Sequence, residues 1–180
     1  MYQGTKRNYA AKKAIVDAFF RLLRKKHFSD IKVTEIVNEA NVARVTYYRN
    51  FYYKEDIVKG YVENLHQELI QFTEASPNFA NILLPKNFNW VLVNAFTLAK
   101  KNKTNFLLLY DNGFSNLLLD LFNEYAEKVL ASYHNLDKYR VLIISGSIFN
   151  ITIQWLKNDT PESVNELAAN LVKLLSIDDT

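Results

Sequence analysis

Apolar residues recur three or four positions apart along most of the chain, which is the spacing of one face of an α-helix. In residues 10–26, for example, Ile15, Phe19 and Leu22 share such a stripe, while the charged residues fall on other faces. Comparable patterns cover residues 33–40, 43–51, 54–72, 86–100, 104–110, 115–134, 138–158 and 161–175. No strand-like alternation of any length interrupts them. The pattern therefore predicts an all-α protein with about nine helices.

Two helix boundaries carry specific signals. The patterns at 33–40 and 43–51 are separated by a turn of three or four residues, the length of a helix-turn-helix connection. Asn41 lies in that turn, and Asn tolerates a positive φ better than most other residues. Further along, Thr160 followed by Pro161 predicts the N-cap and the first residue of the last helix.

Composition narrows the class of protein. The 180 residues are 49% hydrophobic and 23% charged, which suits one folded domain or two small ones. The chain has no cysteine, so disulfides, thiolate chemistry and cysteine zinc sites are excluded. Its first residues are polar and basic, unlike a signal peptide. The most apolar run, 141–156, is too short and too often interrupted for a bilayer span. We expect a soluble, cytoplasmic protein without membrane contact.

The net charge of +3 hides an asymmetry along the chain. Residues 1–60 carry 13 Lys and Arg against 6 Asp and Glu, a balance of +7, whereas residues 61–180 carry 9 against 13, a balance of −4. A basic first third on an acidic remainder indicates an anionic partner for the first part alone. The alternative is a chance cluster of cations on a solvated face.

The second short helical pattern begins with side chains that suit DNA. A helix in the major groove reads base edges with its first residues, while its flanks contact phosphates. Arg44 can donate two hydrogen bonds to a guanine, Val45 can contact a thymine methyl group, and Thr46 can bond a base edge or a phosphate. One turn later, Tyr48 and Arg49 suit phosphate oxygens.

These residues lie within a stretch that resembles a known family. Residues 33–58, "VTEIVNEANVARVTYYRNFYYKEDIV", are similar to the DNA-binding segment of TetR/AcrR regulators, and the preceding helix is similar too. The matching positions are Val33, Ile36, Ala40, Val42, Thr46, Tyr48, Phe51, Lys54, Glu55 and Ile57. The end of the chain is similar to a small C-terminal subtype that includes regulators and coactivators of dihydroxyacetone-kinase operons.

The resemblance implies an organisation and a set of DNA contacts. Residues 1–53 would form a three-helix DNA-binding domain, 54–72 a connecting helix, and 73–180 a helical ligand and dimerisation domain. The DNA-binding residues carried over by motif position are Thr34, Arg44, Val45, Thr46, Tyr48, Arg49, Asn50 and Lys54, of which Tyr48, Asn50 and Lys54 would hold phosphates. Tyr47 takes a core position in this motif.

Several residues depart from the family pattern. Lys32, Ala43 and Tyr53 stand where the family has side chains that cap helices, and each lost cap costs about 1 kcal/mol. Asn50 replaces a histidine that commonly contacts phosphate. These departures predict a less rigid DNA-binding domain.

The C-terminal part offers a dimer interface and a cavity. The family's homodimer uses the last two helices, and here two apolar stripes contribute Leu142, Gly146, Phe149, Val164, Leu167 and Leu171. Six aromatic residues line an effector pocket or simply fill a core: Tyr110, Phe114, Phe122, Tyr125, Phe149 and Trp155.

Little in the sequence points to an enzyme. His27, His66 and His134 are scattered without metal-ligand spacing, and Ser145 and Ser147 lie in a helical pattern rather than at a nucleophile elbow. No glycine-rich phosphate loop is present. We expect no catalytic residue, metal or cofactor.

Together, these observations predict a dimeric regulator that binds an inverted repeat in double-stranded DNA. The preferred hypothesis is a repressor that a small-molecule effector releases. The alternative is a coactivator or adaptor whose C-terminal domain binds a protein partner in place of a ligand.

Overall fold

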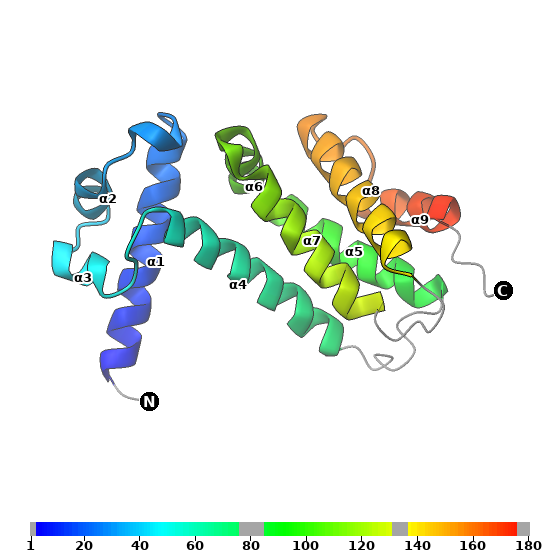
Figure 1. Ribbon diagram of the computed structural model, residues 1–180, viewed down its shortest axis with the longest axis horizontal. Helices are drawn as coiled ribbons and strands as arrows, with labels where there is room; N and C mark the ends of the chain where they lie inside the picture. The colour runs from blue at the N-terminus through cyan, green and yellow to red at the C-terminus, as the bar shows by residue number, and fades with distance from the viewer. Residues whose placement is uncertain (1–2, 76–84, 131–136, 176–180) are drawn as a thin grey trace. The chain divides into compact units, whose positions relative to one another are not determined.

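The computed structural model describes residues 3–75, 85–130 and 137–175, and these residues form nine α-helices and no strand (Figure 1). This confirms the predicted all-α class. The helices are α1 (Gln3–Leu23), α2 (Val33–Glu39), α3 (Arg44–Tyr48), α4 (Glu55–Glu74), α5 (Pro85–Lys101), α6 (Lys103–Leu109), α7 (Ser115–Leu130), α8 (Lys138–Lys157) and α9 (Val164–Leu175). A 3-10 helix, η1, spans Phe28–Asp30, and a π-helical turn, η3, spans Tyr110–Phe114. The predicted helical residues 131–134 lie outside the described part of the chain.

The chain divides into two compact units, Met1–Tyr61 and Val62–Thr180. The division falls within α4, inside the segment for which the sequence predicted a connecting role. We therefore call Met1–Tyr61 the N-terminal unit and Val62–Thr180 the C-terminal unit. None of the described helices is both long and apolar enough to cross a membrane.

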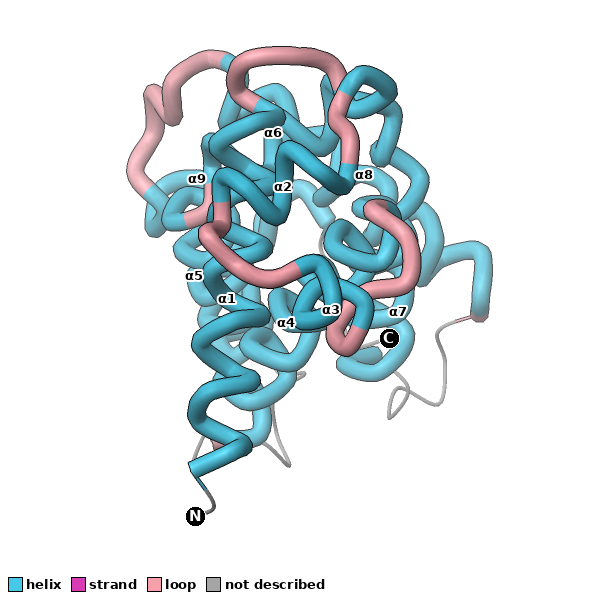
Figure 2. Tube along the Cα trace, turned by 90° about the vertical axis from the view of Figure 1, so that its left-hand side faces the viewer, coloured by secondary structure: helices cyan, strands magenta, loops and turns pink. Residues whose placement is uncertain are grey.

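In the N-terminal unit, α2 and α3 pack against the long α1 (Figure 2). The amphipathic stripe of α1 supplies Ile15 and Phe19, both completely buried, and Ile36 of α2 and Tyr47 of α3 are buried equally well. Because α2 and α3 have only seven and five residues, they are too short to be stable alone in water, and this packing holds them.

The turn between α2 and α3 has the predicted conformation. Asn41 has φ 51°, in the left-handed region, and the Val42 amide donates to the Val37 carbonyl at 3.1 Å. The helix that follows is shorter than the predicted 43–51, because regular α-helix ends at Tyr48.

Two of the missing helix caps are replaced by acidic side chains one turn later. The Asp56 carboxylate accepts hydrogen bonds from the backbone N–H groups of Tyr52 (3.0 Å) and Tyr53 (2.7 Å) at the start of α4. Glu35 similarly accepts from the Lys32 N–H at 2.9 Å before α2. These bonds satisfy N–H groups at the helix starts and offset the expected loss of rigidity. Ala43, before α3, has no side-chain substitute.

In the C-terminal unit, α7 packs on α8 and α5 packs on α9. The last helix does not begin where the sequence predicted, because Thr160 has φ 54° and cannot act as an N-cap. Instead Ser163 and Glu166 form a reciprocal capping box: the Glu166 N–H donates to the Ser163 hydroxyl, and the Ser163 N–H donates to the Glu166 carboxylate. The predicted cap at Thr160 is therefore wrong, and α9 begins at Val164.

Candidate functional site

The short helix α3 has one buried face and one exposed face. Tyr47 is completely buried, whereas Val45 and Tyr48 are 57% and 47% exposed. Arg44 and Arg49 are exposed too. Arg44 lies one turn before Tyr48, with its guanidinium 3.5 Å from the phenol oxygen and 5.7 Å from the ring centre. Four predicted DNA-binding residues are thus brought together on one exposed surface, which we call the α3 face: Arg44, Val45, Tyr48 and Arg49.

The acidic side chains of α2 pair with cations outside the α3 face, so they do not neutralise Arg44 and Arg49. Arg21 of α1 binds Glu39 at 2.6 Å, and Lys26 binds Glu35 at 2.6 Å. Both cations lower the pKa of the glutamate that they contact through these hydrogen bonds. In the described part of the chain, neither Arg44 nor Arg49 forms a salt bridge. The acids of α2 are therefore neutralised by cations other than the two of the α3 face.

Three further predicted DNA-binding residues lie in different settings. Thr34, near the start of α2, is exposed, and Thr46 is half-buried. Asn50 is half-buried as well, and its amide donates to the Thr46 carbonyl at 2.9 Å. This bond satisfies a free carbonyl at the end of α3, so one donor of Asn50 is engaged within the protein rather than with a phosphate.

Lys54, the eighth predicted DNA-binding residue, has its ammonium group fully engaged. The nitrogen donates to the carbonyls of Phe28 (2.7 Å), Ser29 (3.3 Å) and Ile31 (3.1 Å), and it lies 4.3 Å from the centre of the Phe28 ring. A lysine ammonium has three hydrogens, and three carbonyls accept them here. Lys54 thus ties the beginning of α4 to η1, which directly precedes α2.

Two exposed tyrosines extend the α3 face, and the sequence motif did not predict this extension. Tyr52 and Tyr53 are 71% and 62% exposed, and their rings lie edge to face with centres 4.8 Å apart. Together with Tyr48 and the exposed Lys32 they line a shallow groove beside the beginning of α4. The signal was visible in the sequence as consecutive tyrosines in a short loop, where at least one of them has to face solvent.

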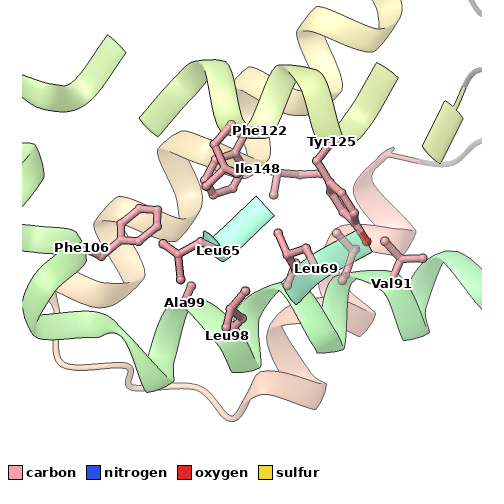
Figure 3. A pocket seen from close by; sticks show the side chains of 12 residues that line it. Leu65, Leu69, Val91, Leu98, Ala99, Phe106, Phe122, Tyr125 and Ile148 are labelled. Carbon is pink, nitrogen blue, oxygen red and sulfur yellow. The ribbon is translucent and has the colours of Figure 1, made fainter. Parts of the chain in front are cut away.

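The C-terminal unit contains a cavity of about 50 Å³ between helices (Figure 3). Its lining consists of Leu65, Leu69, Val91, Leu92, Ala95, Leu98, Ala99, Phe106, Leu121, Phe122, Tyr125 and Ile148. Of the six predicted pocket residues, Phe122 and Tyr125 belong to this lining. The sequence did not lead to the prediction that α5 lines the cavity. The feature that could have indicated it is a pair of small residues, Ala95 and Ala99, which lie one helical turn apart among larger apolar residues.

The other four predicted pocket residues do not line the cavity. Tyr110 and Phe149 contact each other, and Phe149 packs edge to face on Phe122. Trp155 is buried against Phe96, and its indole N–H donates to the Glu162 carbonyl at 3.1 Å. Phe114 is half-buried in the π-helical turn. Trp155 therefore belongs to the buried core, whereas Tyr110 and Phe149 are half-buried aromatic residues that pack against each other outside the cavity lining.

The predicted dimer residues separate into exposed and buried ones. Leu142 of α8 is 44% exposed, and Gly146, Phe149 and Val164 are half-buried. Leu167 and Leu171 are buried within the chain, since α9 packs its apolar stripe on α5. The sequence reasoning did not include the most exposed apolar side chains of these helices: Tyr139 (66%), Ile143 (65%) and Leu174 (77%).

Comparison with known proteins identifies the chain's relatives. Residues 86–176, half of the chain, match the family model TetR_C_8, described as "Transcriptional regulator C-terminal region". No curated protein sequence matches the chain.

Several solved structures of transcription regulators have the same fold as this chain. A TetR transcriptional regulator from Streptococcus agalactiae is 20% identical over 96% of this chain and 97% of that one, with a TM-score of 0.68. The dihydroxyacetone kinase operon activator DhaS is 22% identical over 92% and 94%, with a TM-score of 0.64. The fatty acid degradation regulator FadR from Bacillus halodurans is 21% identical over 91% and 93%, with a TM-score of 0.61. At these identities the likeness shows the fold.

The contacts of Lys54 predict that its replacement destabilises the N-terminal unit. Lys54→Met keeps the aliphatic stem but leaves three carbonyls without their charged donor, so we expect the free energy of unfolding to fall by about 2 kcal/mol. Urea denaturation measures this loss, and Lys59→Met, at an exposed position of α4, is the matched control. The salt dependence of DNA binding should keep its slope, whereas loss of a phosphate contact lowers the slope by about one. Unchanged stability with a lowered slope would contradict this role.

Burial of Tyr47 predicts a substitution that stabilises the protein. Its hydroxyl is buried without a hydrogen-bond partner among the residues that the structure describes, and burial raises the pKa of Tyr47 to about 12. Tyr47→Phe should raise the free energy of unfolding by about 1 kcal/mol at pH 7.5. The gain should grow above pH 10, because the wild-type phenol ionises in the unfolded chain before it does in the folded one. Urea denaturation at pH 7.5 and 10.5 tests this, with Tyr48→Phe as an exposed control. A destabilised Tyr47→Phe protein at both pH values would refute it.

Proposed function

This chain belongs to the TetR family of transcriptional regulators, and we propose that it acts as a homodimeric, cytoplasmic repressor that binds an inverted-repeat operator. As a member of this family it is a transcription regulator and not an enzyme. The proposal concerns the mode of regulation, the DNA contacts and the effector.

The observation that carries the proposal is the composition of the α3 face. Arg44 and Arg49 supply cations without a salt-bridge partner in the described residues, and Val45 supplies an exposed apolar contact. This combination suits the major groove, where guanidinium groups bond guanine edges or phosphates and apolar groups meet thymine methyls. Tyr48 adds a phenol that can donate to a phosphate. The α3 face would therefore read bases with its first turn and contact the backbone with its second.

Dimerisation would use the exposed apolar side chains of the last two helices. Tyr139, Leu142 and Ile143 lie on the first half of α8, and Leu174 lies near the end of α9. Exposed apolar groups at these positions favour burial in a symmetric contact between two copies. Leu167 and Leu171 would support this interface from beneath, because they hold α9 on α5.

One observation favours the alternative function, a coactivator whose C-terminal unit binds a protein. The cavity of about 50 Å³ is far smaller than the roughly 300–1,000 Å³ of pockets for drug-sized ligands. The structurally similar DhaS is described as an operon activator, which is consistent with this reading. A stoichiometric protein partner in a pulldown, without any ligand-induced shift in melting temperature, would favour the alternative over the repressor.

Replacement of Arg44 tests the assignment of the α3 face. In fluorescence anisotropy with DNA from the adjacent promoter, the wild-type protein should show sequence-preferring, salt-dependent binding. Arg44→Ala should weaken binding to the preferred site by about 1–3 kcal/mol and relax base choice at one position. Lys101→Ala removes one charge from the C-terminal unit and should leave affinity unchanged. Absence of sequence preference in the wild-type protein, with and without candidate effectors, would rule out the proposal.

A charge placed at Ile143 tests the dimer interface. Ile143→Glu should raise the dimer dissociation constant at least about 100-fold, because the symmetric interface would bury two unpaired carboxylates. The side chain is exposed in the single chain, so the fold should persist, as a thermal melt can verify. Thr97→Glu places the same charge at an exposed position of α5 as the control. Sedimentation velocity measures the outcome, and an intact Ile143→Glu dimer would exclude this surface.

A further inference from the structure

The cavity in the C-terminal unit has an almost entirely apolar lining. Eleven of its twelve lining side chains are hydrocarbon, and the twelfth is Tyr125 (Figure 3). The lining contains no charged side chain, amide or imidazole that could pair with an ionised ligand. Burial of an unpaired charge costs far more than the contacts of a small molecule return. An occupant of this cavity is therefore uncharged.

A titratable pair on the neighbouring helices does not change this conclusion. His66 follows Leu65 on α4 but is not part of the lining, and its Nδ1 lies 3.4 Å from the Glu124 carboxylate. A negative ligand would thus meet a histidine already facing a carboxylate. The other ion pairs of these helices, Lys101 with Glu68 and Lys128 with Glu74, are exposed and also outside the lining.

The hydrogen bonds of Tyr125 determine which polar group the cavity accepts. The Thr73 hydroxyl donates its single hydrogen to the Leu69 carbonyl at 2.8 Å. The hydroxyl groups of Tyr125 and Thr73 are 2.5 Å apart, so Tyr125 has to be the donor in that bond. Its hydrogen is used, and only lone pairs remain on the Tyr125 oxygen. A ligand can bond this oxygen by donating a hydrogen, as an alcohol does, but not through a ketone or carboxylate oxygen.

The size of the cavity limits the ligand further. A volume of about 50 Å³ is about a third of the roughly 150 Å³ engineered cavity that holds benzene. The room lies beside Ala95 and Ala99, whose short side chains leave space between α5 and the neighbouring helices. A slim, unbranched chain suits such a space better than a ring system or a branched molecule.

We propose that this cavity takes a small, uncharged, slim aliphatic molecule with a hydroxyl or similar donor directed at Tyr125, and that it excludes carboxylates. This inference deepens the proposed function and rests on it, since the occupant would be the effector of the regulator. It names the chemical class of the ligand, which the family alone leaves open.

A homologous series of probes tests the inference on the purified full-length protein. Calorimetric titration with 1-alkanols from propanol to hexanol should show affinity rising about fourfold for each added methylene until the small cavity is full, and no further rise for longer chains. The matching alkanoates at pH 8 and the matching 2-ketones should bind at least about tenfold more weakly. Tyr125→Phe should weaken alkanol binding about two- to tenfold and leave the ketones unchanged.

Two cavity-filling variants make the test specific to the site. Ala99→Leu should abolish alkanol binding, and Ala95→Leu serves as a second filling variant in case the first fails to fold. Ala169→Leu, at an exposed position of α9, should bind alkanols like the wild-type protein. Alkanol binding that survives both filling variants would overturn the assignment of the site.

The outcome separates this inference from the proposed function. Alkanoates that bind as tightly as alkanols, or no binding of either series, would overturn the ligand class while leaving DNA binding intact. DNA binding is measured in parallel without any alcohol, and its absence would count against the proposed regulator alone. Chain-length-dependent binding of alkanols, lost in Ala99→Leu, supports the inference.

Discussion

A helix of five residues cannot hold itself together in water, so the α3 face depends on what α3 is packed against. Tyr47 provides that packing, since its ring is completely buried in the N-terminal unit and contacts Phe51. Burial of this single side chain directs the residues before and after it outward. The mixture of cations and aromatic rings in this stretch follows from that division, because Tyr47 and Phe51 anchor the helix while Arg44, Tyr48 and Arg49 face solvent.

The surrounding loops hold this arrangement with polar bonds rather than with conventional helix caps. Asp56 satisfies two N–H groups at the beginning of α4, and Lys54 satisfies three carbonyls of the η1 segment. The Asp56 bonds lie where the family pattern has a capping side chain, and the Lys54 bonds join the start of α4 to the η1 backbone. In the N-terminal unit, hydrogen bonds from charged side chains therefore do part of the work of helix caps.

Sequence patterns were enough for the helical class and the turn at Asn41, because these depend on local spacing and on one backbone conformation, and the resemblance to the family motif was enough for the burial of Tyr47. Neither was enough for contacts between distant segments. The bonds from Lys54 to Phe28, Ser29 and Ile31 span more than twenty residues, so a lysine in a DNA-binding motif suggested a phosphate instead. The cavity lining was predicted incompletely for a similar reason. Helical spacing cannot distinguish aromatic residues that fill a core, such as Trp155, from those that border a cavity, such as Phe122.

In the proposed function, the α3 face of each subunit lies in the major groove of one of two half-sites. Guanine methylation interference tests this most directly, because a methyl group on guanine N7 blocks contacts in the major groove. This binding mode predicts interference at two symmetric clusters of guanines, separated by one helical turn of about 10 base pairs or a multiple of it. Full binding to DNA methylated at every guanine of the operator, or a single asymmetric cluster, would contradict it.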